Sequence, residues 1–247
     1  MDSFVIPPDI NGYKTIIPEA VIPKTINVAL FDGEGAGIPG EEHVLSVLTP
    51  YPSIHVEKLA PSQIRSDTLS SFDVVIFSGG ASHAQAHTLG DDGLEAVRIF
   101  IENGGGYLGI CAGAHLAIAG SVWTLGILNA KKVVEDEWRR GKGFVDIELT
   151  EEGRNIFGDV QEIFKCRYAN GVIITPLQDP ALPPYTIGAY FRTEIADNDT
   201  TKGAMINTPA IVMSTYGKGR VMTISSHPEN TPGLEHMIAR AVVWVAQ

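Results

Sequence analysis

Cysteine is scarce in this sequence, and its scarcity excludes several kinds of site. The 247 residues contain two cysteines, Cys111 and Cys166, which lie far apart in the chain. Two such cysteines form neither the spacing of a metal site nor a disulfide framework, as expected in a reducing compartment. We therefore expect no metal and no cofactor, while a single disulfide between Cys111 and Cys166 stays open.

Positive charge is also sparse. Lys and Arg number 18 against 29 Asp and Glu, which makes the net charge −11. Because nucleic acids and anionic membranes attract basic patches, neither is an expected partner. The dense basic cluster Trp138-Arg-Arg-Gly-Lys142 is interpreted as a solvated loop, with a contact to an anionic substrate group as the alternative.

Long apolar runs are missing as well. No run approaches the roughly 18 residues that a membrane span requires, and the amino terminus lacks the basic start and apolar stretch of a signal peptide. A cytoplasmic location is therefore the expectation. Hydrophobic residues still make up 44% of the chain, enough for the core of one large α/β domain or two small ones.

The order of predicted elements indicates an α/β fold. Buried strands are expected at 26–31, 54–59, 73–77 and 107–110, and helices at 41–48 and 91–103. Such alternation predicts a doubly wound, mostly parallel sheet with helices on both faces. The later chain predicts a β-rich extension, with strands at 132–134, 143–149, 163–168 and 185–195, a hairpin of 210–216 and 219–226, and a closing helix at 233–246.

Two further segments complete the predicted organisation. Residues 1–25 are proline-rich and lack periodicity, so we expect an extended arm, with 26–247 forming one domain. The glycine-rich loop at 32–37 follows the first strand, but its spacing fits neither the Walker pattern nor the dinucleotide fingerprint. It is interpreted as a wall of an active-site cleft.

One stretch changes from strand to helix around a cysteine. Gly109 and Gly113 flank Cys111 at two residues on either side, as glycines flank the nucleophile in a strand-turn-helix elbow. The turn would hold the thiol at the amino end of a helix, whose free N–H groups favour a thiolate. A cysteine among glycines and alanines is also often a small buried hydrophobe, and the motif alone leaves both interpretations open.

The tripeptide His227-Pro-Glu229 follows the second strand of the predicted hairpin. Proline favours extended backbone before it, in which residues two apart project to the same side, so His227 and Glu229 are expected side by side. A carboxylate on one imidazole nitrogen leaves the other to exchange a proton with a thiol. Cys111 and His227 both follow strand ends and could share one rim of the sheet. A surface turn with a satisfied histidine is the alternative.

Together these motifs resemble the Cys-His-Glu site of class I glutamine amidotransferase-like proteins. Within that group the sequence is most similar to the biotin-protein ligase amino-terminal domain family. The similarity extends from about residue 26 to the end and includes the early glycine-rich loop, the Gly-Gly-Ala loop at 79–81, Gly109-Ile-Cys-Ala-Gly-Ala114 and Tyr168-Ala-Asn-Gly171. The resemblance implies a flavodoxin-like sheet.

The resemblance also implies residue roles. It makes Cys111 the nucleophile, His227 the base and Glu229 its orienting carboxylate. The implied oxyanion hole uses backbone N–H groups of Gly79, Gly80 and Ala112, and the candidate substrate contacts are His83, His115, Tyr168 and Asn170.

Three further histidines lie close to the predicted site in the sequence. His83 and His87 are expected in the loop of the oxyanion hole, where they could touch substrate or simply be solvated. Amidotransferases that bind glutamine usually carry Gln four residues after the nucleophile, but this chain has His115, which leaves glutamine in doubt as the substrate.

The expected function is that of a cysteine-dependent amide hydrolase or amidotransferase-like enzyme that forms a covalent thioester on Cys111. Its expected partner is a small amide or peptide substrate. If ammonia is transferred, a separate acceptor or synthetase protein is expected outside these 247 residues. The alternative is a non-catalytic binding or regulatory module of the biotin-protein ligase amino-terminal type that keeps the same fold.

Overall fold

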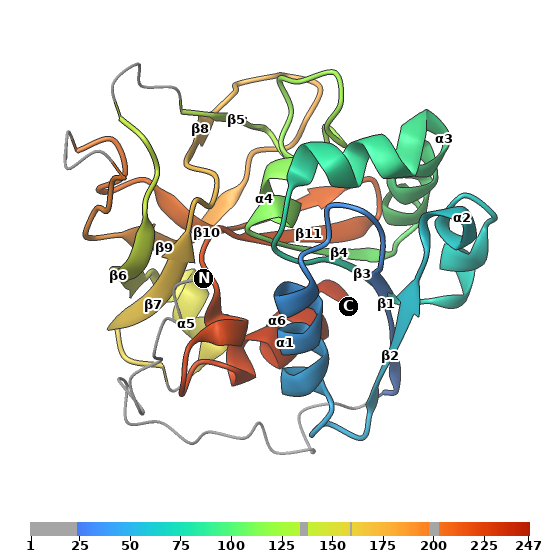
Figure 1. Cartoon of the computed structure of the whole chain (residues 1–247), viewed down its shortest axis with the longest axis horizontal. Coiled ribbons are helices and arrows are strands. Elements are labelled where there is room, and N and C mark those ends of the chain that lie inside the picture. Colours follow the sequence, from blue (N-terminus) through green and yellow to red (C-terminus); the bar gives the residue numbers. More distant parts are fainter. Residues whose placement is uncertain (1–23, 134–137, 159, 198–202) are drawn as a thin grey trace.

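A computed structural model describes residues 24–133, 138–158, 160–197 and 203–247 (Figure 1). Of the arm expected at 1–25, residues 1–23 lie outside the described residues, and Lys24 forms an ion pair with Asp73 at 2.8 Å. Within the described part of the chain, no helix combines the length and the apolar character needed to cross a membrane.

A nine-stranded sheet runs through the molecule. In spatial order its strands are β2 (Ile54–Leu59), β1 (Ile26–Phe31), β3 (Val74–Phe77), β4 (Gly106–Ile110), β11 (Gly219–Ile224), β10 (Pro209–Tyr216), β9 (Thr186–Phe191), β6 (Lys142–Leu149) and β7 (Ile163–Ala169). The strands from β2 to β11 pair in parallel, and the remaining pairs are antiparallel. The predicted parallel sheet and its β-rich extension are thus one continuous sheet, which confirms the fold class.

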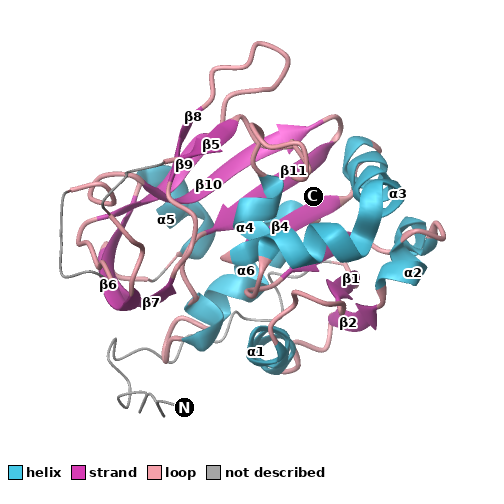
Figure 2. Cartoon of the chain, turned by 45° about the horizontal axis from the view of Figure 1, so that its top comes forward, coloured by secondary structure: helices cyan, strands magenta, loops and turns pink. Residues whose placement is uncertain are grey.

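Helices cover both faces of this sheet (Figure 2). Helices α1 (Ile38–Leu48), α5 (Glu151–Phe157) and α6 (His236–Val245) pack on one face, and α2 (Pro61–Ile64), α3 (Ser82–Glu102) and α4 (Ala112–Ala117) on the other. Successive strand residues point to opposite faces, so Leu30 enters the core shared with α1 and α6, whereas Phe31 enters the core shared with α3. Burial on both faces explains why the inner strands β1 and β3 are almost wholly apolar.

The carboxyl ends of β3, β4 and β11 meet at one edge of the sheet. Ile110 lies beside Ile224 in the parallel pair β4–β11, and β3 neighbours β4 on its other side. Open α/β sheets bind their ligands at this edge. The segments that carry Gly79, Cys111 and His227 start from it, so the fold brings these residues together.

The helix expected at 91–103 is longer than predicted. Helix α3 begins at Ser82, and Gly90 within it has non-helical backbone (φ 64°, ψ 177°). His83 and His87 therefore lie on a helix, so their expected position in a loop was wrong. Gly90 interrupts the periodicity by which the first half of the helix could have been recognised.

Some predicted strands also differ from the structure. Of the strand expected at 132–134, residue 134 lies outside the described residues, and Lys132 ends β5 (Ala130–Lys132), which pairs with β8 (Ile174–Pro176) in a separate two-stranded sheet. The strand expected at 185–195 ends at Phe191. Helices α2 and α5 and strand β8 were not predicted, because elements of three to seven residues carry too little periodicity.

Candidate functional site

Cys111 occupies a strained turn between β4 and α4. Its backbone has φ 52° and ψ −94°. Residues other than glycine rarely adopt a positive φ of this kind. The flanking glycines permit the turn: a Cβ on Gly113 would lie 2.0 Å from the carbonyl oxygen of Phe77, and one on Gly109 would lie 2.5 Å from that of Gly113. Strain of this kind concentrates at functional sites and presents the side chain at the strand end.

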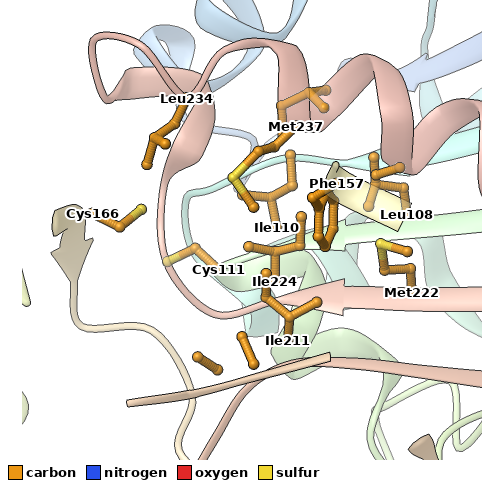
Figure 3. Close-up of a cluster of buried hydrophobic side chains, with 14 of the residues drawn as sticks. Leu108, Ile110, Cys111, Phe157, Cys166, Ile211, Met222, Ile224, Leu234 and Met237 are labelled. Carbon is orange, nitrogen blue, oxygen red and sulfur yellow. The ribbon is translucent and has the colours of Figure 1, made fainter. Parts of the chain in front are cut away.

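The thiol of Cys111 lies between the core and the edge of the sheet. The residue is 7% exposed and belongs to a hydrophobic cluster that includes Ile110 and Ile224 (Figure 3). Its Sγ atom lies 3.5 Å from the carbonyl oxygen of Ala169, and its backbone N–H donates to the carbonyl of Ile224 at 2.8 Å. The end of β7 and the end of β11 therefore hold the turn from two sides.

Cys166 is a different kind of cysteine. It is fully buried on β7, and its sulfur lies 3.6 Å from the hydroxyl of Thr231. Burial raises the pKa of its thiol to about 12, so this thiol is protonated and unreactive at neutral pH. Both cysteines are free, and Figure 3 shows their side chains on separate segments, so the disulfide that the sequence left open is not formed.

His227 and Glu229 follow β11, beside the turn of Cys111. Nδ1 of His227 lies 2.6 Å from Oε1 of the buried Glu229. The tripeptide is not extended as expected, because Pro228 begins a short 3-10 helix (Pro228–Asn230), yet the carboxylate still reaches the ring. The backbone N–H of His227 donates to the carbonyl of Arg167 at 2.8 Å, which ties this segment to β7.

The ring of His227 is protonated at neutral pH. Burial lowers its pKa, but the negative charges of Glu229 and of a Cys111 thiolate, with hydrogen bonding to both side chains, outweigh burial and raise the pKa from 6.5 to about 10. Its Nε2 atom is buried and has no nitrogen or oxygen partner among the described residues. The site therefore holds a positively charged ring beside the turn of Cys111.

Gly79 lies against both His227 and Cys111. A Cβ at this position would lie 2.8 Å from Cε1 of His227 and 3.7 Å from Cβ of Cys111. The backbone N–H groups of Gly80 and of Ala112, the first residue of α4, donate no hydrogen bond to another described residue. Free N–H groups beside a nucleophile can stabilise an oxyanion.

A cavity of about 450 Å³ opens onto the cysteine and the histidine. Its walls come from the segments after β1, β3, β4 and β11 and from the neighbouring ends of β6 and β7. Its size suits a small molecule or a short peptide segment. Within the described residues, no group of three or more His, Cys, Asp or Glu side chains is placed to hold a metal ion.

The sequence matches one protein family over most of its length. The family described as "Biotin-protein ligase, N terminal" matches residues 26–242, most of the chain. The chain belongs to this family. No curated protein matches it.

Solved structures show the same fold at low identity. PurLQS from Thermotoga maritima is 14% identical with a TM-score of 0.65, over 90% of this chain and 100% of that one. A cytoplasmic protein from Salmonella typhimurium LT2 is 17% identical with a TM-score of 0.56, over 89% and 97% of the two chains. A glutamine amidotransferase from Thermotoga maritima is 13% identical with a TM-score of 0.51, over 83% and 76%. This member of the biotin-protein ligase N-terminal family therefore has the class I glutamine amidotransferase-like fold.

The cavity of this family member brings together most of the predicted site residues. Those that line it are Gly79, Gly80, Cys111, Ala112, His115, Asn170, His227 and Glu229. Gly37 also lines it, in agreement with the interpretation of the early glycine-rich loop as a cleft wall. His83 and Tyr168 are not among the described residues of the lining.

These two residues have other contacts. His83 lies on α3 and packs its ring against Trp123, with centroids 5.3 Å apart. Tyr168 is fully buried and its hydroxyl donates to the carbonyl of Gly171 at 2.7 Å. A Cβ on Gly171 would lie 1.9 Å from the carbonyl oxygen of Ser225. The Tyr-x-Asn-Gly motif thus shapes the loop beside the cysteine through packing and backbone contacts.

His115 stands where glutamine-binding amidotransferases carry Gln. Its Nδ1 lies 2.9 Å from the hydroxyl oxygen of Ser82, and its ring packs edge-on against Trp123. Burial, reinforced by the positive charges of Arg140 and Lys132, lowers the pKa of His115 to about 4. The cavity therefore contains a neutral imidazole at this position.

Sequence reasoning only partly anticipated the basic wall of the cavity, because it gave a substrate contact for the cluster at 138–142 as the alternative and did not single out Arg167. Arg140, Lys142 and Arg167 all line it, as do His43 and Asn230. The interpretation of 138–142 as a solvated loop was wrong, because Trp138 is buried and Lys142 begins β6. Trp138 was the available signal, since large aromatic side chains are mostly buried in folded proteins.

Proposed function

We propose that this protein is a cysteine-dependent amide hydrolase or amidotransferase-like enzyme in which Cys111, His227 and Glu229 act as a triad. The observation that carries the proposal is the 2.6 Å contact between His227 and Glu229 beside the strained turn of Cys111. A carboxylate in this position orients the ring and keeps it protonated, as a cysteine nucleophile paired with histidine requires.

In the first half-reaction, the thiolate of Cys111 attacks the carbonyl carbon of a bound amide. The carbonyl electron pair moves to oxygen, and backbone N–H groups of Gly79, Gly80 and Ala112 stabilise the resulting charge. When the carbonyl re-forms, the C–N bond breaks and Nε2 of His227 donates its proton to the departing nitrogen. An acyl thioester then remains on Cys111.

In the second half-reaction, water attacks the thioester carbon. The neutral ring of His227 accepts a proton from the water, and the C–S bond breaks. The thiolate and imidazolium pair is restored, with a carboxylic acid as one product and ammonia or an amine as the other. In an amidotransferase, a separate acceptor or synthetase protein would receive the ammonia.

Alkylation and turnover test the proposal together. Iodoacetamide is expected to label Cys111 at least about tenfold faster than Cys166 in the folded protein, because a thiolate is the reactive form. A panel of amides and short peptides should release ammonia or amine with the parent protein and not with Cys111→Ala. Equal or slower labelling at Cys111 would overturn the nucleophile assignment.

A non-catalytic binding module is the second candidate, and one contact favours it. The sulfur of Cys111 lies 3.5 Å from the carbonyl oxygen of Ala169, and the residue is 7% exposed, so the thiol is partly shielded. A fold can keep a binding surface without the chemistry of its relatives. Turnover that depends on Cys111 rejects this candidate, whereas ligand binding without turnover, retained in Cys111→Ala, supports it.

A further inference from the structure

We propose that Arg140, Lys142 and Arg167 form a subsite for a carboxylate group, so that the amide cleaved at Cys111 belongs to a net negative molecule. This inference rests on the proposed function, because it names the substrate class of the same cavity. All three cationic side chains line the cavity that contains Cys111. The basic wall is a local departure from a chain whose net charge is −11.

Two of the cations lie on the same face of the sheet. In the antiparallel pair β6–β7, Lys142 is opposite Ala169 and Phe144 is opposite Arg167. Lys142 and Arg167 are therefore diagonal neighbours, a relation that places Cα atoms about 7–8 Å apart. The carbonyl oxygen of Ala169 lies 3.5 Å from the sulfur of Cys111, so this end of the β6–β7 pair borders the cysteine, and both cations line the same cavity.

In the β6–β7 pair, another lysine has an acidic partner, whereas Lys142 has none among the described residues. Asp146 is opposite Lys165, and their charged atoms are 2.8 Å apart. Within the described part of the chain, neither Lys142 nor Arg140 forms an ion pair. A bound carboxylate would supply the counter-charge that Lys142 and Arg140 lack among these residues.

Arg140 is held in place at the border of the cavity. Its guanidinium donates to the carbonyl of Gly171 at 3.0 Å, next to Asn170. Its charge acts on the neighbouring groups: burial and then Arg140 lower the pKa of Lys132, and burial, Arg140 and Lys132 lower the pKa of His115. Burial disfavours charge of either sign, whereas the part of these shifts that comes from the positive charge of Arg140 would favour a bound anion.

The acidic side of the lining is already engaged. Glu229 is the one acidic residue among the described residues of the wall, and it is bonded to His227. Oε1 of Glu229 is bonded to the ring and Oε2 is buried, so a substrate ammonium group would find no exposed carboxylate in this lining. A carboxylate would find the planar donors of arginine. Free glutamine carries both charges. A monoamide of a dicarboxylic acid, or another amide with a carboxylate and no ammonium group, fits this lining better.

Two electrophiles of similar size report the charge preference of the cavity. Iodoacetate carries a carboxylate where iodoacetamide carries a neutral amide, and both alkylate a thiolate. The ratio of their rate constants at Cys111 is compared with the same ratio for 2-mercaptoethanol. We expect the ratio at Cys111 to be about tenfold higher and to fall as sodium chloride is added, because salt screens the charges of the wall.

Charge variants distinguish the effect of the proposed subsite on this rate ratio from the effect of the positive charge of His227. Lys142→Gln and Arg140→Gln should each lower the iodoacetate-to-iodoacetamide ratio about threefold, the effect of a unit charge at roughly 7 Å in a water-like dielectric. Arg140→Lys keeps the charge and should keep most of the ratio. Lys218→Gln removes an exposed cation from the β10–β11 turn, outside the cavity, and should leave the ratio unchanged.

Protection of the thiol tests the substrate class directly. Succinamate, which joins an amide to a carboxylate, should slow the labelling of Cys111 by iodoacetamide at millimolar concentration. Neutral succinamide and zwitterionic glutamine should protect at least about fivefold less at the same concentration. Equal protection by all three would overturn the carboxylate subsite.

The two proposals fail in different ways. A ratio equal to that of 2-mercaptoethanol, or one that Lys142→Gln and Arg140→Gln leave unchanged in folded protein, overturns the subsite and leaves the nucleophile assignment intact. Failure of both reagents to prefer Cys111 over Cys166 overturns the proposed function itself.

Discussion

Nδ1 of His227 lies 2.6 Å from Oε1 of Glu229, although Pro228 separates the two residues and begins a 3-10 helix. Glu229 is only 3% exposed, so its charge is little screened by water. Its other carboxylate oxygen, Oε2, is buried with no partner among the described residues. The interaction with the ring is therefore the main compensation for burying this carboxylate, and it determines the charge of His227.

Replacing Glu229 by Gln keeps the size of the side chain and removes its charge. We expect iodoacetamide labelling of Cys111 to slow at pH 7 and amide turnover to fall. The loss should be smaller than the roughly 10⁴-fold loss in a serine triad, because a thiol ionises more readily than a hydroxyl. Circular dichroism should show a retained fold. Unchanged labelling and turnover would oblige us to withdraw the triad.

The raised pKa of His227 predicts a loss of stability at alkaline pH. The folded ring keeps its proton up to about pH 10, whereas the ordinary pKa is 6.5. Its contribution is fully present below pH 6.5 and is lost as the pH rises through about 10. Urea unfolding at pH 6 and pH 10 should show a larger decrease for the parent protein than for Glu229→Gln. The same decrease in both proteins would contradict this account.

His115 predicts the opposite dependence on the acid side. Burial and the charges of Arg140 and Lys132 lower its pKa to about 4, so the unfolded chain binds a proton below pH 6.5 that the folded protein excludes. This contribution is present above pH 6.5 and is lost as the pH falls toward 4. His115→Gln should therefore lose less stability between pH 7 and pH 5 than the parent.

The exposed His55 on β2 provides a matched control for this measurement. His55→Gln should show the same loss between pH 7 and pH 5 as the parent. If the His115 and His55 variants have the same pH dependence, His115 does not cause the loss of stability between pH 7 and pH 5.

Two glycines should respond differently to alanine. A Cβ on Gly113 would lie 2.0 Å from a backbone oxygen of Phe77, so Gly113→Ala must displace backbone and should cost at least about 2–3 kcal/mol of stability. A Cβ on Gly79 would instead lie 2.8 Å from the ring of His227, a side chain that can move. Gly79→Ala should thus slow Cys111 labelling and turnover at least about tenfold with a smaller loss of stability. Thermal unfolding measures the loss of stability in each variant, and the labelling rate measures the reactivity of Cys111. A Gly113→Ala protein as stable as the parent would refute the steric argument.

The central parallel strands could be predicted because they are buried on both faces, and the edge strand β2 because apolar and exposed polar residues partly alternate along it. Strands β1 and β2 begin and end at the predicted residues, Ile26–Phe31 and Ile54–Leu59. Such strands appear in sequence as nearly continuous or clearly alternating apolar runs bounded by turn residues. The start of α3 could not be predicted, because Gly90 breaks its apolar repeat and the packing of its first turns depends on distant residues.

The sequence by itself determined the fold class and the glycine-flanked turn at Cys111, because each depends on apolar periodicity or on backbone preferences within a few residues. His227 and Glu229 do lie side by side, but through a 3-10 turn rather than the extended backbone from which their proximity was predicted. Only the tertiary structure decided that Lys142 and Arg167 line the same cavity. Their proximity depends on the register of β6 on β7, and a shift of one residue would turn either side chain to the other face of the sheet. Register is set by packing over the whole sheet, so no local pattern in the sequence specifies which cations meet the thiol.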